Sequence, residues 1–335
     1  RMPGCAGTLA AAAGPSNLRP RPSGPEPLPV RDITPLPCGG WRLSAGTRAR
    51  YRLGMAENPR RTPSRTFGSV SVAMVTPMHP DGSIDVPAAR VLARHLVASG
   101  CDALVLNGTT GESPTTHQPE KDDLVAAVVD EVGSQVMIIA GAGSNDTAHA
   151  VRIARAAERN GAHGVLVVSP YYNRPSQEGV YRHIRSIVDS VNLPAMLYDI
   201  PGRTGVAIGD EILDRLAEHP RIRAVKDATG DVPAGFDRMR RTGLEFYSGD
   251  DALNLAWLTH GASGVVSVVG HVVAGRYAQM VQAIDDGDLF RARDLSAELA
   301  PICEAIMGGG QGAVMSKAAL YLQGHLPSPA VRSPL

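Results

Sequence analysis

The sequence of 335 residues predicts an α/β protein: a (β/α)8 TIM barrel with a disordered N-terminal tail and a C-terminal helical extension. From residue 66 onward, short apolar runs alternate with amphipathic segments, and this alternation implies a parallel sheet. The runs are almost continuously apolar, as in strands that are buried on both faces. Eight strand–helix pairs in roughly 220 residues match the size of this barrel.

The eight expected strands are short apolar runs, each followed by a helix-like stretch. They are Val70–Thr76, Ala103–Asn107, Val136–Ala140, Gly164–Ser169, Ala195–Ile200, Arg223–Asp227, Glu245–Ser248 and Gly264–Val268. A doubly wound open sheet is the alternative. It would usually carry a glycine-rich phosphate turn after its first strand, where this chain has Pro77-Met78-His79-Pro80. The sequence therefore favours the closed barrel.

Helices between the strands are expected from apolar residues at helical spacing. The first four are Pro87–Ala98, Pro119–Val132, Asp146–Asn160 and Gln177–Val191. We expect Asp85, Asn145 and Ser176 to cap three of them, because each side chain can accept a hydrogen bond from a free N–H of the first turn. Two later stretches, Leu289–Met307 and Val314–Leu322, form the extension. The barrel is thus expected over residues 66–287 and a helical region over 288–335.

Residues 1–65 are expected to form a disordered tail. Eleven of the chain's 26 prolines lie there, mixed with glycine, alanine and arginine, and no apolar period is sustained. The run from Leu9 to Ala13 is shorter than the apolar region of a secretory signal. The chain begins with Arg1, whereas Met55 lies just before the first patterned segment. We therefore expect Met55 or a near neighbour to begin the natural protein.

The zero net charge of the chain hides an asymmetry. Residues 1–65 contain eleven arginines and three acidic residues, so the rest of the chain carries a net charge of about −8. Such a barrel does not offer the clustered basic surface that nucleic acid requires. The sequence contains no run of 18 apolar residues, so it predicts no membrane span. The four cysteines lack the spacing of a disulfide framework or a metal site; they are Cys5, Cys38, Cys101 and Cys303. We therefore expect a reduced, cytoplasmic protein with no nucleic-acid or membrane partner.

Unusual residues gather where the expected strands end, and the active sites of such barrels lie at the carboxyl ends of the strands. Three of the chain's eight tyrosines are among them. The turn at Thr109 and Thr110 offers hydroxyl and N–H groups that can hold a carboxylate, although such a sequence also forms an ordinary turn. In chain order these segments are Gly108-Thr109-Thr110-Gly111-Glu112-Ser113, Pro170-Tyr171-Tyr172-Asn173, Tyr198-Asp199-Ile200-Pro201-Gly202-Arg203, Val225-Lys226-Asp227-Ala228 and Ser248-Gly249-Asp250-Asp251.

Lys226 is the strongest candidate for a nucleophile. It lies in an apolar strand, where the alternation of side chains puts it on one face with Ala224 and Ala228. Burial disfavours the ammonium form of an amine and makes the amine nucleophilic. The alternative is a lysine that reaches the rim and pairs with a carboxylate. Tyr198 on the preceding strand is expected within reach of this amine, or else is a tyrosine of the barrel core.

The chain has only two other lysines. Lys121 lies among acidic residues and is expected to be a solvated helix residue, and Lys317 is expected to have no chemical neighbours. A Schiff base, if the protein forms one, therefore belongs to Lys226. The pair Asp250 and Asp251 lacks a histidine or a third carboxylate at ligand spacing, and the histidines show no pairing, so we expect no metal. We interpret the aspartate pair as a helix cap.

In combination, these motifs identify a family. From about Phe67 to the C-terminus the chain resembles the dihydrodipicolinate synthases, within the pyruvate-dependent Schiff-base lyases and aldolases. The resemblance implies that Lys226 forms a Schiff base with pyruvate, that Tyr198 relays protons at the imine, and that Thr109 links this tyrosine to a second one. The residue that matches the second tyrosine is Tyr172, which in the family enters the active site of the neighbouring subunit.

Substrate contacts are also implied by the resemblance. The residue that matches a pyruvate-carboxylate contact is Thr110, and the residue that matches the ligand of the semialdehyde carboxylate is Arg203. Gly249 and Val266 match residues that line the pocket. The implied reaction condenses pyruvate with L-aspartate 4-semialdehyde to 4-hydroxy-tetrahydrodipicolinate, the first committed step of diaminopimelate and lysine biosynthesis. It requires no metal and no organic cofactor, and the family suggests a homo-oligomer, a dimer of dimers.

Two alternatives stay open. The first is another pyruvate-dependent aldolase, such as N-acetylneuraminate lyase or a keto-deoxy-sugar acid aldolase. These relatives generally lack residues matching Arg203 and Tyr172, and both are present here. The second is a catalytically silent barrel that serves in binding or assembly.

The chain departs from the family's pattern at several positions. Asp199 and Asp227 stand where many relatives have Asn and Glu, and both differences keep a polar side chain. In lysine-inhibited relatives a histidine pair and a glutamate hold the inhibitor, and without them we expect little inhibition. The matching residues here are Gln118, Lys121 and His149. Relatives also continue past the segment matching Val331–Leu335 into a final helix, so we expect a truncated C-terminal region.

Overall fold

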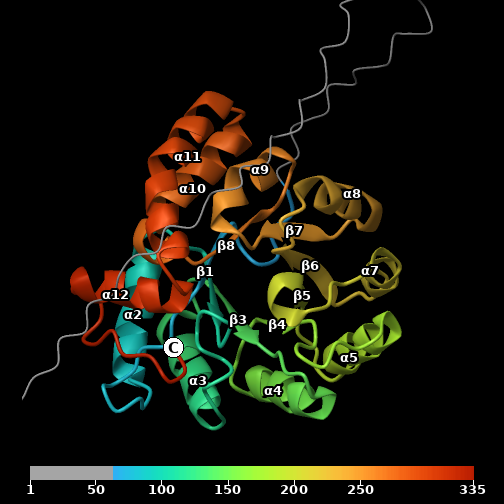
Figure 1. The fold of residues 1–335 in the computed structure, drawn as a ribbon, viewed down its shortest axis with the longest axis horizontal. Helices are drawn as coiled ribbons and strands as arrows, with labels where there is room; N and C mark the ends of the chain where they lie inside the picture. The colour runs from blue at the N-terminus through green and yellow to red at the C-terminus, as the bar shows by residue number, and fades with distance from the viewer. Residues whose placement is uncertain (1–62) are drawn as a thin grey trace, which may run out of the picture. The chain divides into compact units, whose positions relative to one another are not determined.

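The computed structural model describes residues 63–335, so the expected start at Met55 and nearly all of the expected tail lie outside the described residues. Eight parallel strands pair in chain order, and β8 pairs with β1 to close a barrel (Figure 1). The predicted TIM barrel is confirmed, and each predicted strand overlaps an observed one. The strands are β1 (Val70–Ala73), β2 (Ala103–Leu106), β3 (Met137–Gly141), β4 (Gly164–Val168), β5 (Ala195–Asp199), β6 (Ile222–Asp227), β7 (Glu245–Ser248) and β8 (Gly264–Ser267).

Strand β1 is shorter than predicted, ending at Ala73 rather than at Thr76. Beyond it, the N–H of Val75 donates to Nε2 of His271 over 3.0 Å. The hydroxyl of Thr76 donates to the carbonyl oxygen of Gly111 over 2.7 Å. These residues therefore bond to neighbouring loops instead of continuing the sheet.

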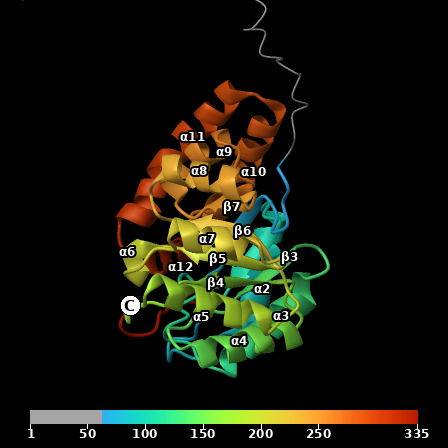
Figure 2. The same ribbon diagram turned by 90° about the vertical axis from the view of Figure 1, so that its right-hand side faces the viewer.

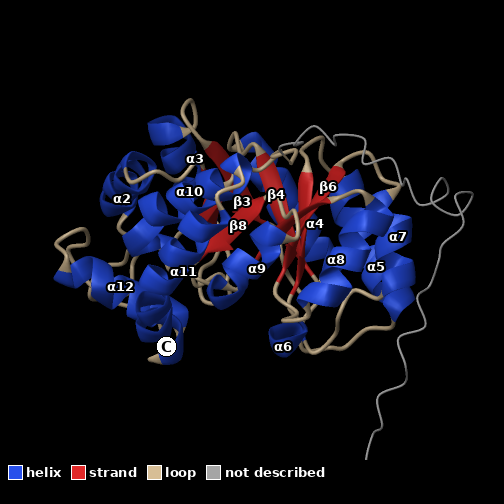
Figure 3. Ribbon diagram, turned by 90° about the horizontal axis from the view of Figure 1, so that it is seen from above, coloured by secondary structure: helices blue, strands red, loops and turns tan. Residues whose placement is uncertain are grey.

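Helices surround the strands, as Figure 3 shows. Predicted caps at Asp85 and Ser176 are confirmed, since their side chains accept from the N–H groups of Ala88 and Gly179. The predicted cap at Asn145 is wrong. The carboxylate of the next residue, Asp146, caps that helix by accepting from the N–H of Ala148 over 2.9 Å. The helices are α2 (Val86–Ala98), α3 (Glu120–Val132), α4 (Thr147–Arg159), α5 (Gln177–Asp189), α6 (Pro201–Thr204), α7 (Asp210–Ala217), α8 (Val232–Thr242), α9 (Asn254–Thr259) and α10 (Gly270–Asp286).

The C-terminal extension is helical, as predicted. Helix α11 (Leu289–Cys303) lies beside α10 and continues into a short π-helix over Glu304–Gly308 (Figure 1). Helix α12 (Gly312–Leu322) follows. The segment after α12 returns to the loop that follows β2, where the guanidinium of Arg332 donates to the carbonyl oxygen of Thr115 over 2.8 Å.

Two separate apolar clusters fill the fold. One lies between the strands and the helices, and residues such as Leu104, Ile138 and Val225 belong to it. The other fills the barrel interior, because alternate residues of each strand point inward. The interior residues are Phe67, Ala73, Ala103, Val105, Ile139, Leu166, Met196, Tyr198, Ala224, Tyr247 and Val266, with Ala228 packed against them. The strand face predicted for Ala224 and Ala228 is therefore the interior face.

The residues just before β1 are bonded to the barrel. Ser64 donates to the carboxylate of Glu245 over 2.6 Å. Arg65 forms an ion pair with Asp285 at 2.8 Å. Residues 63–65, which the sequence analysis places in the tail, thus belong structurally with the barrel. Within residues 63–335 no helix has the length and apolar character that crossing a membrane requires.

Candidate active site

A cavity of about 240 Å³ opens at the carboxyl ends of strands β2 to β5. Three sequence-predicted residues line it: Thr109, Tyr198 and Arg203. Its other walls are Asn107, Gly108, Ser113, Pro114, Gly141, Gly143, Leu166, Val168, Tyr171, Ile200 and Thr204. Figures 2 and 3 show α6 and α12 on this same side of the barrel. A few polar groups set in a mostly apolar wall are typical of a small-molecule site.

Lys226 and Tyr198 are register partners on β6 and β5. The Nζ atom of Lys226 lies 4.3 Å from the centroid of the Tyr198 ring, and both side chains are buried. Lys226 is not itself a wall of the cavity, whereas Tyr198 is, so the amine adjoins the cavity through this ring. Val266 lies with Tyr198 in the interior cluster.

Gly249 packs directly against the lysine. A Cβ atom at this position would come within 3.0 Å of Cγ of Lys226 and within 2.9 Å of the carbonyl oxygen of Asp227. Such contacts are shorter than van der Waals separation, so any larger residue would displace the lysine or the strand. Glycine here preserves the space around the Lys226 side chain.

All three lysines of the chain are buried, which corrects two predictions. Lys121, expected in solvent, donates to Oγ of Ser113 over 3.1 Å, and burial lowers the pKa of its ammonium group. Lys317, expected without neighbours, is fully buried and forms an ion pair with Glu112. Among the residues that the structure describes, Lys226 is the one lysine whose Nζ has no hydrogen-bond acceptor.

Thr109 and Thr110 are carried by residues 107–119, which we call the β2 loop. Two of its residues, Asn107 and Glu112, have positive φ angles of 54° and 58°, a region that costs free energy for residues other than glycine. The side chain of Glu112 is held by Lys317 and by the N–H of Arg332, at 2.9 Å from the latter. Thr109 lines the cavity, while Thr110 is buried beside it and is not a wall.

Arg203 is carried by residues 200–209, which we call the Arg203 loop. The loop begins with the single turn α6, which ends at Gly205 in the left-handed conformation (φ 76°), where glycine is unstrained. The guanidinium of Arg203 is exposed at the cavity wall, and within residues 63–335 it has no hydrogen-bond or ion-pair partner. A free guanidinium can bind a carboxylate through two parallel hydrogen bonds.

The two adjacent tyrosines point to different surroundings. Tyr171 lines the cavity, whereas the side chain of Tyr172 is 89% exposed. Tyr172 also has a positive φ of 74°, and its N–H donates to the carbonyl oxygen of Thr204 over 3.3 Å. The structure therefore does not bring Tyr172 to the cavity of its own chain.

Two buried aspartates follow the central pair directly. Asp199 comes after Tyr198, Asp227 comes after Lys226, and the two aspartates are themselves register partners. Burial raises the pKa of Asp199 to about 6 and also raises the pKa of Asp227. One carboxylate oxygen of Asp227 accepts from the N–H and the hydroxyl of Thr229 at 2.9 and 2.7 Å. Its other oxygen is buried without a partner in the described part of the chain.

The aspartate pair after β7 is structural, as predicted. Asp250 accepts from the N–H of Ala252 and caps a short 3-10 helix over Asp251–Leu253. Asp251 accepts from the N–H groups of Val268 and Val269 at 2.8 and 3.1 Å. Across residues 63–335 no group of three histidine, cysteine or carboxylate side chains is arranged to hold a metal ion. Cys101 and Cys303 are buried free thiols.

Sequence reasoning missed the two glycines that shape the cavity wall at β3. A Cβ atom on Gly141 would lie 2.2 Å from the carbonyl oxygen of Asn107, and one on Gly143 would lie 2.4 Å from Cγ1 of Val168. Both glycines permit close approach of neighbouring strand ends. The signal available in the sequence was the small-residue run Gly141-Ala142-Gly143 directly after the third apolar strand.

Comparison with known proteins identifies the relatives of this chain. The sequence model of the dihydrodipicolinate synthetase family matches residues 66–335. A 4-hydroxy-tetrahydrodipicolinate synthase from Kineococcus radiotolerans is 55% identical over 273 residues, covering 82% of this chain and 89% of the relative. The 4-hydroxy-tetrahydrodipicolinate synthase 2 of Streptomyces coelicolor is 53% identical over 277 residues, covering 83% of this chain and 92% of the relative.

Solved structures agree with the sequence relatives. The dihydrodipicolinate synthase of Aquifex aeolicus superimposes with a TM-score of 0.78 at 33% identity, over 80% of this chain and 92% of that one. The chloride-inhibited enzyme of Acinetobacter baumannii, complexed with pyruvate, gives 0.77 at 34% identity with the same coverage. The matched family model, the close relatives and the shared barrel together show that the chain belongs to the dihydrodipicolinate synthetase family of lyases.

Proposed function

We propose that this enzyme condenses pyruvate with L-aspartate 4-semialdehyde through a Schiff base on Lys226, giving 4-hydroxy-tetrahydrodipicolinate. One observation carries the proposal: in the described part of the chain, Lys226 is the lysine whose buried Nζ has no acceptor, and it lies against the ring of Tyr198 at the cavity. Lys121 and Lys317 are held by Ser113 and Glu112. An amine that is not engaged by an acceptor keeps its lone pair available once it is deprotonated.

The reaction follows from this amine. The Lys226 nitrogen attacks the ketone carbon of pyruvate and releases water, forming an imine that withdraws electrons from the methyl group. Loss of a methyl proton gives an enamine, whose carbon attacks the aldehyde of the second substrate and forms the new carbon–carbon bond. The amino group of that substrate then attacks the imine carbon, closes the ring and displaces the Lys226 nitrogen.

Proton transfers are assigned to hydroxyl groups. Tyr198 is placed beside the amine, and Thr109 lines the same cavity. Phenols suit a relay because they both donate and accept hydrogen bonds. We assign the second tyrosine of the relay to Tyr172 of a neighbouring subunit, since its side chain is exposed and does not line the cavity of its own chain.

Two carboxylates have to be held, one on each substrate. We assign the pyruvate carboxylate to the turn at Thr109 and Thr110, of which Thr109 lines the cavity and Thr110 follows it in the chain. We assign the carboxylate of the semialdehyde to Arg203, whose guanidinium is free at the cavity wall. Gly249 and Val266 complete the surroundings of Lys226 and Tyr198.

The decisive test is covalent trapping. Incubation with pyruvate and borohydride should reduce the imine and attach the adduct to Lys226, as read by peptide mass spectrometry. Lys226→Ala should abolish the adduct, whereas Lys121→Gln, which removes another buried amine, should keep it. An adduct on Lys121 or Lys317 would contradict the assignment. Assays with the semialdehyde and with sialic acid, run side by side, separate the proposed reaction from that of a sugar-acid aldolase.

Subunit exchange tests the shared tyrosine. If Tyr172 completes a neighbour's site, a dimer interface gives and receives one tyrosine per subunit. Mixing Tyr172→Phe with Lys226→Ala subunits should restore activity in heterodimers, because one site then holds Lys226 from one chain and Tyr172 from the other. Each variant refolded alone is the control. Heterodimers that stay inactive, although mass analysis confirms their formation, would show that Tyr172 has no such role.

A further inference from the structure

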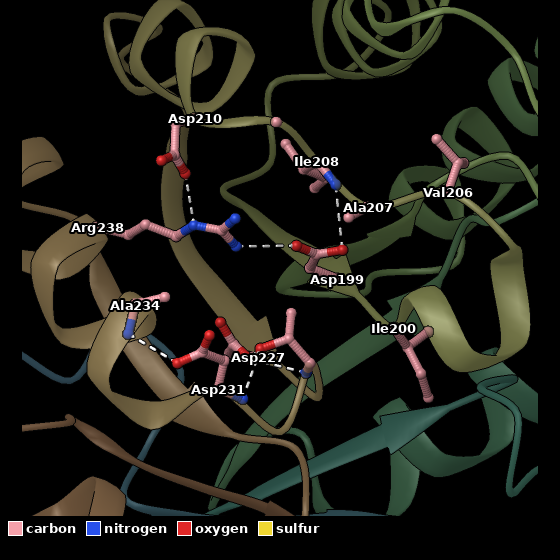
Figure 4. Close-up of polar contacts among 12 residues, drawn as sticks. Asp199, Ile200, Val206, Ala207, Ile208, Asp210, Asp227, Asp231, Ala234 and Arg238 are labelled. Atoms are coloured by element: carbon pink, nitrogen blue, oxygen red, sulfur yellow. Dashed lines mark hydrogen bonds and ion pairs between the residues drawn. The ribbon is translucent and has the colours of Figure 1, made fainter.

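The start and the end of the Arg203 loop are tied together by one buried side chain, Asp199. Asp199 is the last residue of β5 and directly precedes the loop. Its Oδ1 atom accepts from the N–H of Ile208, near the end of the loop, over 3.2 Å. Figure 4 shows this contact, which spans nine residues of sequence and closes the loop on itself.

An arginine extends this closure to the next helix. The guanidinium of Arg238 on α8 donates to Oδ2 of Asp199 over 3.3 Å. Through its Nε atom it also donates to Asp210 over 2.7 Å (Figure 4). Asp210 is the first residue of α7, so the helix that follows the loop is bound to the strand that precedes it. We call Asp199, Arg238 and Asp210 the loop clasp.

The loop clasp is buried at the end nearest the site. The side chain of Asp199 is 2% exposed, that of Arg238 17%, and that of Asp210 60%. Ile208 is buried as well. Removing the Asp199 carboxylate would therefore leave the N–H of Ile208 and the Arg238 guanidinium without this acceptor. Because water reaches these donors poorly, leaving them unpaired would cost free energy.

Other contacts hold the end or the middle of the loop, where the N–H of Tyr172 donates to the carbonyl oxygen of Thr204 over 3.3 Å. The side-chain amide of Gln177 bonds to the carbonyl oxygen of Ala207 and the N–H of Gly209, at 2.9 and 2.7 Å. Within α6, the hydroxyl of Thr204 donates to the carbonyl oxygen of Ile200 over 3.0 Å. None of these contacts joins the two ends of the loop, whereas Asp199 does.

We propose that Asp199 is a positioning residue: by closing the Arg203 loop it fixes the Arg203 guanidinium where the carboxylate of the second substrate binds. The inference rests on the function proposed above, because it takes Arg203 as the ligand of that carboxylate. Asp199 itself does not line the cavity, so we assign it no contact with either substrate. Its removal should therefore weaken binding of the semialdehyde and leave imine formation with pyruvate intact.

The experiment compares three variants in two measurements. Asp199→Ala removes both contacts, Asp199→Asn keeps a neutral acceptor, and Asp214→Asn is the matched control. Asp214 also joins α7 to α8, by accepting from Nε of Arg241 over 2.7 Å, but it does not touch the loop. Steady-state kinetics give KM for each substrate, and hydrogen exchange read by mass spectrometry gives the protection of the amides of residues 201–209.

Asp199→Ala should raise KM for the semialdehyde about tenfold, equivalent to about 1.4 kcal/mol, and change KM for pyruvate less than about twofold. Exchange should quicken in residues 201–209, and pyruvate trapping on Lys226 should persist. Asp199→Asn should show the same pattern to a smaller degree, and it decides the question if Asp199→Ala does not fold. Asp214→Asn should change neither measurement.

Four outcomes would overturn the inference. An equal rise in both KM values would mean a general structural role, and unchanged exchange in residues 201–209 would mean that the loop does not depend on Asp199. Arg203→Ala, measured in parallel, distinguishes a failure of the role proposed for Arg203 from a failure of the role proposed for Asp199. If Arg203→Ala leaves KM for the semialdehyde unchanged, the role proposed for Arg203 fails and the positioning role with it. If Arg203→Ala raises that KM and the Asp199 variants do not, the positioning role alone fails.

Discussion

The β2 loop and the Arg203 loop are each held by one buried carboxylate, but the two carboxylates are compensated very differently. Glu112 in the β2 loop meets the ammonium group of Lys317, which is also fully buried, and the N–H of Arg332. Asp199 at the Arg203 loop meets a guanidinium that is shared with the exposed Asp210, and it faces a second buried aspartate, Asp227.

This difference has a physical consequence for each loop. A buried carboxylate with a full positive partner is stable as long as the partner is present, and the loss of either member leaves an isolated charge. A buried carboxylate with a shared partner is only partly compensated, so protonation becomes competitive. The β2 loop should therefore be sensitive to mutation of its partner, and the Arg203 loop should be sensitive to pH.

The largest effect is expected from removing the partner of Glu112. Lys317→Ala leaves an uncompensated carboxylate in the interior and should lower the free energy of unfolding by about 3–5 kcal/mol. Urea denaturation followed by circular dichroism measures it. The double variant Lys317→Met with Glu112→Gln should be less destabilised than Lys317→Ala, because it leaves no buried charge. A loss below about 1 kcal/mol in the single variant would contradict the comparison.

The second-largest effect is expected from the titration of the Asp199 carboxylate. Its pKa is about 6, raised by burial above 3.8, so the folded state binds the proton more tightly than the unfolded chain. The stabilising effect of that proton is complete below about pH 4 and is lost as the pH rises through 6. Asp227 adds to this shift, while the N–H of Ile208 and the Arg238 guanidinium oppose it.

The measurement compares Asp199→Asn with the unmodified protein. As the pH rises from 4 to 7, the unmodified protein should lose unfolding free energy relative to Asp199→Asn, by up to about 3 kcal/mol. Asp214→Asn, which removes the other carboxylate that joins α7 to α8, is measured as the control. At Glu120, which directly follows the β2 loop, the sign is opposite. The Arg332 guanidinium lowers the pKa of Glu120 to about 2, so the contribution of this carboxylate is lost only as the pH falls below about 4.5. A flat difference for Asp199→Asn would show that the carboxylate is fully compensated.

A smaller effect is expected from Arg332. Its guanidinium donates to the carbonyl oxygens of Gly82 and Thr115 and pairs with Glu120, which is partly exposed. Arg332→Ala keeps the backbone N–H that bonds Glu112, so the free energy of unfolding should fall by only about 1–2 kcal/mol. The same urea titration reads this change. A loss as large as that of Lys317→Ala would place the main anchor of the β2 loop at Arg332.

The smallest effect is expected from free L-lysine. Lys121 is buried and bonded to Ser113 in the β2 loop, and its cation would repel the ammonium group of an inhibitor. His149 bonds to Ser144 over 3.4 Å and supplies no carboxylate. Millimolar L-lysine should therefore change initial rates by less than about twofold. Strong, cooperative inhibition would mean that other residues form a lysine site.

The barrel could be predicted because its signal is local. Each strand is an apolar run, and the polar motifs follow the runs directly, so the gathering of Thr109, Tyr198 and Arg203 at one cavity follows from the parallel order of the strands. The neighbouring positions of Lys226 and Tyr198 follow in the same way from strand register. Motif and period thus predicted three residues of the cavity wall and the pairing of Lys226 with Tyr198 beside it.

Burial of the other lysines could not be predicted locally. Lys317 is neutralised by Glu112, a residue 205 positions away, and no feature of its own helix indicates that partner. Lys121 lies next to acidic residues in sequence but turns toward Ser113. Likewise, Asn145 and Asp146 are both good caps, and only the backbone geometry selects the second. Long-range partners and single-residue shifts are set by tertiary packing, which a sequence pattern does not contain.

The pairing of Glu112 with Lys317 also sets an order of events on the ribosome. Lys317 is synthesised 205 residues after Glu112, which at about 5–20 residues per second takes roughly 10–40 s. During that interval the early strands can already be collapsing while the Glu112 carboxylate lacks its cation. The β2 loop therefore reaches its final form late in synthesis. A nascent chain released before residue 317 would carry Thr109 and Thr110 on a loop that still bonds to Thr76 but lacks its contacts with Lys317 and Arg332.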